Sequence, residues 1–159
     1  MKRVFVDSGG FFAHLVAEDA LHGRARDLFG QAEQERWGLI TTNAVVYETH
    51  ALLTNRARNG REAGLRFLDH IERGLCAVVY VTRDDEQAAI AILGGQQDKL
   101  YSLCDALSFV VMQRLGVAEA IAFDRHFRDY GGFTILWDRS GCDRAGTGSD
   151  RRGNTVGYR

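Results

Sequence analysis

The sequence predicts an α/β domain whose central sheet is mostly parallel, has about five strands and is covered by helices. Short apolar runs alternate with stretches of helical spacing in the order β α α β α α β α α β α β, which is typical of parallel sheets with helical crossovers. The 159 residues are enough for one domain with a substantial core. We expect this domain to span residues 1–138. Residues 139–159 are rich in glycine and poor in apolar side chains, which predicts a disordered tail.

Composition and charge narrow the class of protein. The chain carries 20 Lys and Arg against 21 Asp and Glu, a formal net charge of -1, so nucleic-acid binding would require a local basic patch. No apolar run is long enough to span a membrane, and the N-terminus lacks a secretory signal pattern. The cysteines match neither a zinc spacing nor a disulfide framework, so we interpret them as reduced thiols in the cytoplasm: Cys76, Cys104 and Cys142.

The first predicted strand, residues 3–6, ends at an acid. Asp7 follows the apolar run VFV, and Ser8-Gly9-Gly10 then breaks the strand and leads into a helix over residues 11–16. This order of strand, acid, turn and helix opens an α/β unit. Asp7 either caps the helix or belongs to a site at the carboxyl end of the strand. The glycines indicate a phosphate loop only weakly, because neither common glycine-rich phosphate motif is present.

A second acid lies early on a later helix. We expect a polar helix over residues 19–36 and a strand over residues 37–41, after which Thr42 and Asn43 are both suitable N-caps. The helix that they open carries Glu48, whose neighbours three and four positions away are mostly apolar. A single Glu on a helix usually faces solvent, but an acid in an apolar stripe needs a partner or a metal.

The densest basic stretch before the tail covers residues 54–66. Four arginines stand there against one acid, Glu62: Arg56, Arg58, Arg61 and Arg66. Solvated helix ends explain such a run, and so does a surface that faces phosphates. A helix to residue 73, a strand over residues 77–81 and a helix over residues 84–93 follow.

Residues 101–127 hold two further acids in different settings. Ser102 is an N-cap type, and Asp105 three residues later completes a capping-box pattern before a helix that ends at Gly116. A short apolar strand over residues 117–123 follows, and Asp124 comes directly after it. Helix capping alone explains each acid locally. A last strand is expected over residues 133–137.

The predicted topology lets these acids meet at one edge of the sheet, where ligands bind in open parallel sheets. The four acids are Asp7, Glu48, Asp105 and Asp124. Four adjacent carboxylates would repel one another and their pKa values would rise unless a cation were present. Oxygen ligands of this kind suit Mg²⁺ or Mn²⁺, and such a site activates water for phosphodiester hydrolysis. Three polar residues are candidates to hold carboxylates or waters around the metal: Ser8, Asn43 and Ser108.

Other chemistries have less support. The chain has no G-x-S-x-G motif, and its five histidines show no spacing typical of paired metal ligands. His126 either approaches a phosphate or packs at the surface. Cys104 has no evident base nearby in the sequence.

The chain resembles PIN-domain ribonucleases and, among them, the VapC toxins of type II toxin–antitoxin pairs. The resemblance rests on the segments VFVDSGGFFA, TTNAVVYETHALL, DKLYSLCDALSFVVM and AIAFDRHF, which are spread over residues 4–127, and the FTIL strand also fits. It departs from the family at Cys104, where many members carry Thr or Ser, and at Gly9-Gly10, where bulkier residues are common. The tail matches no part of the family pattern.

The resemblance implies an α/β/α sandwich, a Mg²⁺-dependent endoribonuclease, a homodimer and an inhibitory antitoxin partner. It assigns the metal to Asp7, Asp105 and Asp124, with Glu48 completing the site. The alternatives are a PIN-type nuclease of RNA maturation or quality control without an antitoxin, and a non-catalytic module that binds RNA or protein. For the RNA strand we hypothesise two flanking groups of arginines: Arg56, Arg58 and Arg61 on one side, and Arg125 and Arg128 on the other.

Overall fold

The computed structural model describes residues 1–96 and 98–136. Its strands form a single sheet in the order β3-β2-β1-β4-β5, and every neighbouring pair is parallel. The strands are β1 (Arg3–Val6), β2 (Gly38–Thr42), β3 (Ala77–Val79), β4 (Glu119–Ile121) and β5 (Thr134–Ile135). The predicted α/β/α sandwich with a parallel sheet of five strands is confirmed.

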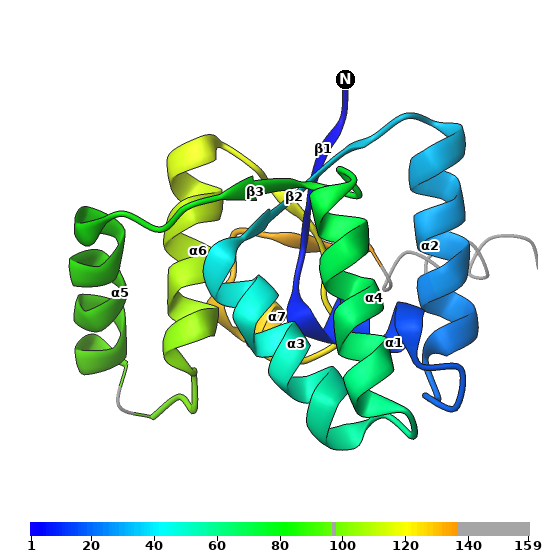
Figure 1. Cartoon of the computed structure of the whole chain (residues 1–159). Coiled ribbons are helices and arrows are strands. Elements are labelled where there is room, and N and C mark those ends of the chain that lie inside the picture. The colour runs from blue at the N-terminus through cyan, green and yellow to red at the C-terminus, as the bar shows by residue number, and fades with distance from the viewer. Residues whose placement is uncertain (97, 137–159) are drawn as a thin grey trace, which may run out of the picture.

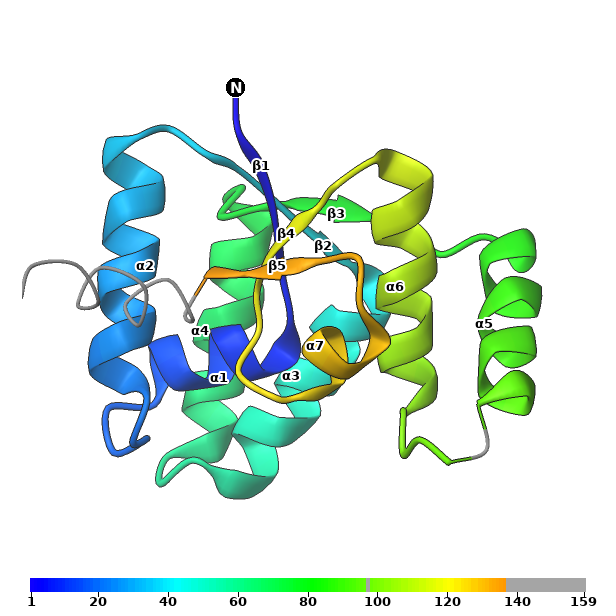
Figure 2. The ribbon, with the colours of Figure 1, turned by 180° about the vertical axis from the view of Figure 1, so that it is seen from behind.

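Helices surround this sheet (Figures 1 and 2). In chain order they are α1 (Ser8–Leu15), α2 (His22–Gln34), α3 (Asn43–Arg56), α4 (Gly60–Glu72), α5 (Arg83–Gly95), α6 (Leu103–Leu115) and α7 (His126–Tyr130). Both views place the paired helices α5 and α6 on one side of the sheet and α2 on the other. The order of helices and strands is the predicted one. In the part of the chain that the structure describes, no helix is long and apolar enough to cross a membrane.

The core lies where the middle strands meet the helices. Val4, Phe5 and Val6 of β1 have no exposed surface, as expected for the central strand of a parallel sheet with helices on both faces. The Phe5 ring lies 6.1 Å from that of Phe127, which lies 5.0 Å from Phe109 of α6 in an edge-to-face arrangement. Aromatic pairs of this geometry stabilise a core beyond the area that they bury. They fix α6 and α7 against the end of β1.

Helix α1 begins three residues before the predicted start at residue 11. Asp7 caps it, and both glycines lie inside the first turn. A Cβ atom on Gly10 would lie 2.6 Å from the Ile121 carbonyl oxygen, so the close approach of α1 to β4 requires a glycine there. The two glycines therefore do not form a separate phosphate-binding loop.

Several strands are shorter than their apolar runs. The run at residues 117–123 contributes only Glu119–Ile121 to β4, because the Val117 N–H donates to the Met112 carbonyl at 2.9 Å and closes the end of α6. Gly116 adopts the left-handed conformation at this C-cap, with φ of 63°, as a helix stop requires. The tail at residues 139–159 and Cys142 lie outside the described residues.

Candidate metal centre

Asp7 is the most deeply buried acid at the carboxyl edge of the sheet. Its side chain Oδ2 accepts a hydrogen bond from the Gly9 N–H at 3.3 Å, and its own N–H donates to the Ile121 carbonyl at 3.1 Å. Only 2% of the residue is exposed. Burial raises the pKa of Asp7 well above its ordinary value, and three nearby carboxylates add to the shift, in the order Asp124, Asp105 and Glu48. A negative charge at this position therefore requires a compensating cation.

Asp105 is held at the start of α6 by the predicted capping box. The Ser102 hydroxyl accepts a hydrogen bond from the Asp105 N–H at 3.0 Å, and the Asp105 Oδ2 accepts one from the Ser102 N–H at 2.7 Å. The same Oδ2 lies 3.0 Å from Nδ1 of His126. The capping box thus fixes the carboxylate, and its charge lies close enough to Asp7 and Asp124 to raise the pKa of both.

Asp124 lies in the turn between β4 and α7. Its Oδ1 accepts a hydrogen bond from the His126 N–H at 2.8 Å, and its Oδ2 is 3.8 Å from His126 Nδ1. Burial raises the pKa of Asp124, and the charge of Asp105 raises it further, although the hydrogen bond from His126 acts in the opposite direction. Asp124 is thus electrostatically coupled to the acid on α6.

Glu48 approaches these acids from α3. It is half-buried, and its charge lies close enough to the Cys104 thiol to raise the pKa of that thiol. Burial and the charges of Glu48 and Asp7 raise the pKa of Cys104 strongly, so this thiol stays neutral and is not a nucleophile. Cys76 and Cys104 are both free thiols.

We call these four acids (Asp7, Glu48, Asp105 and Asp124) the acid site. Figures 1 and 2 show how the end of β1 lies beside α7 and α3. Among the described residues, ligand atoms of Asp105, Asp124 and His126 lie within 4.8 Å of one another, and this group does not include Asp7 or Glu48. The carboxylate oxygens of the acid site suit Mg²⁺ or Mn²⁺, whereas the His126 imidazole contacts the Asp105 carboxylate. The raised pKa values of Asp7 and Asp124 are what such a site shows before a cation neutralises it.

The residues predicted to support the metal have various partners. Ser8 is buried beside Asp7 in the first turn of α1, and its backbone lowers the pKa of Asp7 slightly against the larger upward shift. The Asn43 Oδ1 accepts a hydrogen bond from the Val81 N–H at 2.9 Å and ties α3 to the loop after β3. The Ser108 hydroxyl donates to the Cys104 carbonyl within α6 at 2.9 Å. Neither of the last two contacts reaches a carboxylate of the acid site.

The predicted RNA-binding arginines lie at different distances from the acid site. Arg56, Arg58 and Arg61 are exposed, and Arg56 ends α3, eight residues or about 12 Å along the helix from Glu48. Arg125 and Arg128 belong to the turn and helix that directly follow Asp124. The second group therefore lies closer to the acids than the first.

His126 is a site residue whose role stayed open at the level of the sequence. It links two elements of the site, because its ring contacts Asp105 of α6 while its N–H holds Asp124. The signal in the sequence was its position two residues after an acid that ends a strand. Its contact with Asp105 joins positions 21 residues apart, and no local pattern encodes such a contact.

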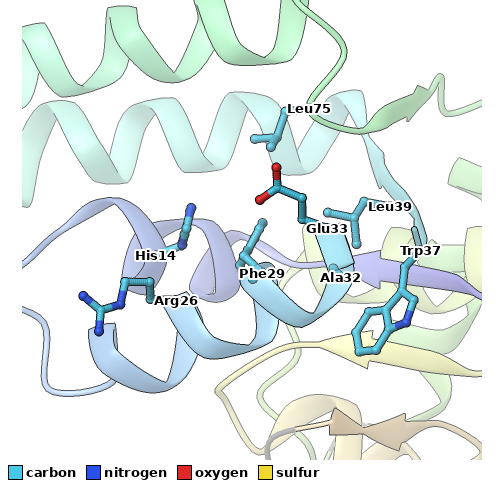
Figure 3. A pocket seen from close by; sticks show the side chains of 9 residues that line it. His14, Arg26, Phe29, Ala32, Glu33, Trp37, Leu39 and Leu75 are labelled. Atoms are coloured by element: carbon cyan, nitrogen blue, oxygen red, sulfur yellow. The ribbon is translucent and has the colours of Figure 1, made fainter. Parts of the chain in front are cut away.

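A separate groove of about 480 Å³ lies on the α2 side of the molecule. Figure 3 shows Phe29 at its centre, His14 and Arg26 toward one end and Trp37 at the other. Among the described residues that line this groove, Glu33 is the one acid. The lining is mainly apolar, so it lacks the donor set of a metal site.

Comparisons with known proteins agree with this geometry. A family model described as the PIN domain matches residues 4–132. The chain is 34% identical over 124 residues to the 23S rRNA-specific endonuclease VapC20 of Mycobacterium tuberculosis, in both strain CDC 1551 / Oshkosh and strain ATCC 25618 / H37Rv, and the match covers 78% of this chain and 91% of VapC20.

A crystal structure of Mycobacterium tuberculosis VapC20, described as a sarcin-ricin loop cleaving toxin, is also similar. Its TM-score to this chain is 0.74 at 33% sequence identity, and the match covers 80% of this chain and 95% of that structure. The similarity thus extends over nearly the whole length of VapC20.

Proposed function

Because the chain belongs to the PIN-domain family, we propose that it is a metal-dependent endoribonuclease that hydrolyses RNA phosphodiester bonds. The observation that carries this proposal is the acid site, where carboxylates from β1, α3, α6 and the turn after β4 converge on one edge of the sheet. A purely structural role does not account for a buried carboxyl such as Asp7, which has like charges around it and, among the described residues, no cationic partner to offset them.

Each acid has a proposed role. Asp7, Asp105 and Asp124 hold Mg²⁺ or Mn²⁺, and Glu48 completes the site and orients the attacking water. When bound there, such an ion would polarise a phosphoryl oxygen and lower the pKa of a coordinated water. The chain supplies the positioning: the capping box fixes Asp105, and the His126 N–H fixes Asp124.

The similarity to VapC20, which is described as a toxin, supports a function within a toxin–antitoxin pair. We propose a small antitoxin protein as partner, a homodimer as the assembly and the cytoplasm as the location. The VapC20 substrate is 23S rRNA, which makes this RNA the first substrate to test. A nuclease of RNA maturation without an antitoxin differs in having no inhibitory partner.

The test is a cleavage assay on total RNA in Mg²⁺ or Mn²⁺, followed by mapping of the cut ends. We expect discrete cuts that EDTA abolishes and that the Asp105→Asn variant does not make. Asp85→Asn is the matched control, because Asp85 also occupies the third position of a helix N-terminus but pairs with Arg114. Cleavage that persists in excess EDTA, or equal cleavage by Asp105→Asn, contradicts the proposal.

A further inference from the structure

A small pocket adjoins the acid site on the side of α7. It has a volume of about 230 Å³, and apart from Leu100 it is lined by polar and charged residues: Asp98, Lys99, Tyr101, Arg125, His126 and Asp129. His126 belongs to both places, since its ring lines the pocket and its Nδ1 contacts Asp105. A group bound in this pocket would therefore lie next to the proposed metal position.

Tyr101 lines the pocket and carries a hydrogen-bond donor that lacks a partner among the described residues. The residue is only 9% exposed, and its ring packs edge-on against Phe109 at 5.3 Å and His126 at 5.6 Å. Its hydroxyl is buried and has no hydrogen-bond partner among the described residues. Leaving a buried polar group unpaired is unfavourable, so such a group calls for an explanation.

The hydroxyl of Tyr101 is suited to donate to an anion. Burial raises its pKa, and the charges of Asp129 and Asp98 raise it further, so the group keeps its proton at neutral pH. An oxygen atom of a ligand in the pocket would accept a hydrogen bond from this hydroxyl, which would then have a partner.

Two cations at the rim are only loosely paired. Lys99 Nζ lies 3.9 Å from Asp98 Oδ2, and Arg125 Nε lies 3.9 Å from Asp129 Oδ2. These distances exceed those of charge-assisted hydrogen bonds, and partly exposed pairs of this kind contribute little stability. Both cations can therefore turn toward a phosphate with little loss.

We propose that this pocket is a subsite for an RNA-backbone phosphate adjacent to the one that is cleaved. The Tyr101 hydroxyl donates to a phosphate oxygen, and Lys99 and Arg125 balance the charge. The inference rests on the proposed ribonuclease function. It adds where the RNA strand would lie next to the proposed metal position. The carboxylates of Asp98 and Asp129 disfavour a free anion, so a phosphate delivered as part of a strand binds better than inorganic phosphate.

The test measures binding of the full-length protein, with EDTA present to prevent cleavage, to a mixed-sequence single-stranded RNA of 12 nucleotides. Tyr101→Phe should weaken binding roughly tenfold, as expected for loss of a hydrogen bond to a charged group. Its melting temperature should stay equal or rise, because the variant removes an unsatisfied hydroxyl. Tyr130→Phe is the control, since the Tyr130 hydroxyl already accepts a hydrogen bond from Gln113, and it should leave binding unchanged.

Charge is tested separately with Lys99→Gln, which should flatten the log–log salt dependence of RNA binding by about 0.7. Arg73→Gln is its control. Arg73 lies between the end of α4 and the start of β3, and so at the amino ends of the strands, whereas the acid site lies at their carboxyl ends.

The kinetics of Tyr101→Phe give a further readout. With Mn²⁺ present, this variant should raise KM while kcat stays nearly constant, as loss of uniform binding predicts.

The outcomes separate this inference from the proposed function. If the wild-type chain cleaves RNA but Tyr101→Phe and Lys99→Gln bind it normally, the subsite is wrong and the nuclease stands. If the two variants weaken binding in a chain that does not cleave, the subsite stands and the hydrolysis is wrong. Absence of RNA binding by the wild-type chain overturns both. Inorganic phosphate that competes as well as the strand at matched ionic strength overturns the assignment to RNA.

Discussion

Helices α5 and α6 begin with the same local structure and put it to different uses. Thr82 and Asp85 form a capping box at α5, as Ser102 and Asp105 do at α6. In each box the Asp carboxylate accepts a hydrogen bond from the N-cap N–H, at 2.9 Å in α5 and 2.7 Å in α6. Both aspartates are buried, with 2% and 7% of their surface exposed.

The two carboxylates differ in what lies opposite them. Asp85 accepts two hydrogen bonds from the Arg114 guanidinium, at 2.9 and 3.0 Å. Although burial acts to raise the pKa of Asp85, hydrogen bonds from Thr82 and Arg114 lower it below its ordinary value. Asp105 instead faces carboxylates and His126. The capping box buries an acid, and the tertiary partner decides whether that acid stabilises the fold or belongs to a site.

The largest difference between the two boxes should appear in catalysis. Asp105→Asn should lower the rate of RNA cleavage by at least about 100-fold, because residues that merely orient metal ligands already account for 10–100-fold effects. The protein should stay folded, since Asn can still accept the hydrogen bond from Ser102 and one repelling charge is removed. Steady-state cleavage rates and circular dichroism check both points. An active variant, or an unfolded one, would remove the contrast with Asp85.

The reciprocal change should affect stability. Asp85→Asn weakens a bidentate pair whose acid is buried, at a cost of about 2 kcal/mol, which corresponds to a fall in melting temperature of roughly 4–8 °C. Cleavage per folded molecule should stay within about twofold of wild type. Calorimetry measures the melting temperature, and cleavage assays normalised to the concentration of folded protein measure the activity. A variant that keeps the wild-type melting temperature but no longer cleaves RNA would show that Asp85 acts in cleavage and not in stability.

The pH dependence of stability should have opposite signs in the two places. Asp7 has a raised pKa in the folded protein, so its protonated form stabilises the fold, and this stability is lost as pH rises through the folded pKa. Asp85 has a lowered pKa, so its contribution is present above the unfolded pKa and lost as pH falls through the folded one.

Metal-free wild-type protein should therefore lose stability above about pH 4, with a slope of at most roughly 1.4 kcal/mol per pH unit for each coupled proton. Asp7→Asn should reduce this slope, and Asp85→Asn should leave it in place, since the Asp85 window lies at lower pH. Melting temperatures of wild type, Asp7→Asn and Asp85→Asn, measured from pH 4 to pH 7 in EDTA, give the three slopes to compare. A slope that is equal in all three proteins would show that the acid site is not its source.

The smallest expected effect concerns the distant arginines. Replacing Arg56, Arg58 and Arg61 together by Gln should weaken RNA binding more at low salt than at high salt, with a change of about 0.7 in the log–log slope for each RNA phosphate that these side chains no longer bind. Metal affinity should not change, because these exposed side chains lie at or beyond the C-terminal end of α3, away from Glu48. An unchanged slope would identify this stretch as ordinary solvated surface.

Much of the fold follows from local patterns. The order of elements, the Ser102 capping box and the Gly116 stop are encoded in contiguous residues, and the structure contains all of them. The meeting of the acids at one sheet edge was also predictable, because parallel strands bring their carboxyl ends together. The roles of these acids stay a proposal, as does the disordered tail.

Other features depend on contacts between distant segments and could not be predicted. The sequence does not indicate that Arg114 pairs with Asp85, 29 positions away, or that His126 joins Asp105 to Asp124. The early start of α1 depends on the clearance between Gly10 and Ile121. Likewise, the unpartnered hydroxyl of Tyr101 is a property of the packed structure and leaves no pattern in the chain.

The most direct test of the central claim is the thermal stabilisation that Mn²⁺ gives to wild type, Asp105→Asn and Asp85→Asn. An ion that binds only the folded acid site stabilises it by about 2.7 kcal/mol at 100 times its Kd, or roughly 5–10 °C for a chain of this size. We expect this shift in wild type and Asp85→Asn and its loss in Asp105→Asn. The absence of a shift in wild type, or an equal shift in Asp105→Asn, would contradict this expectation.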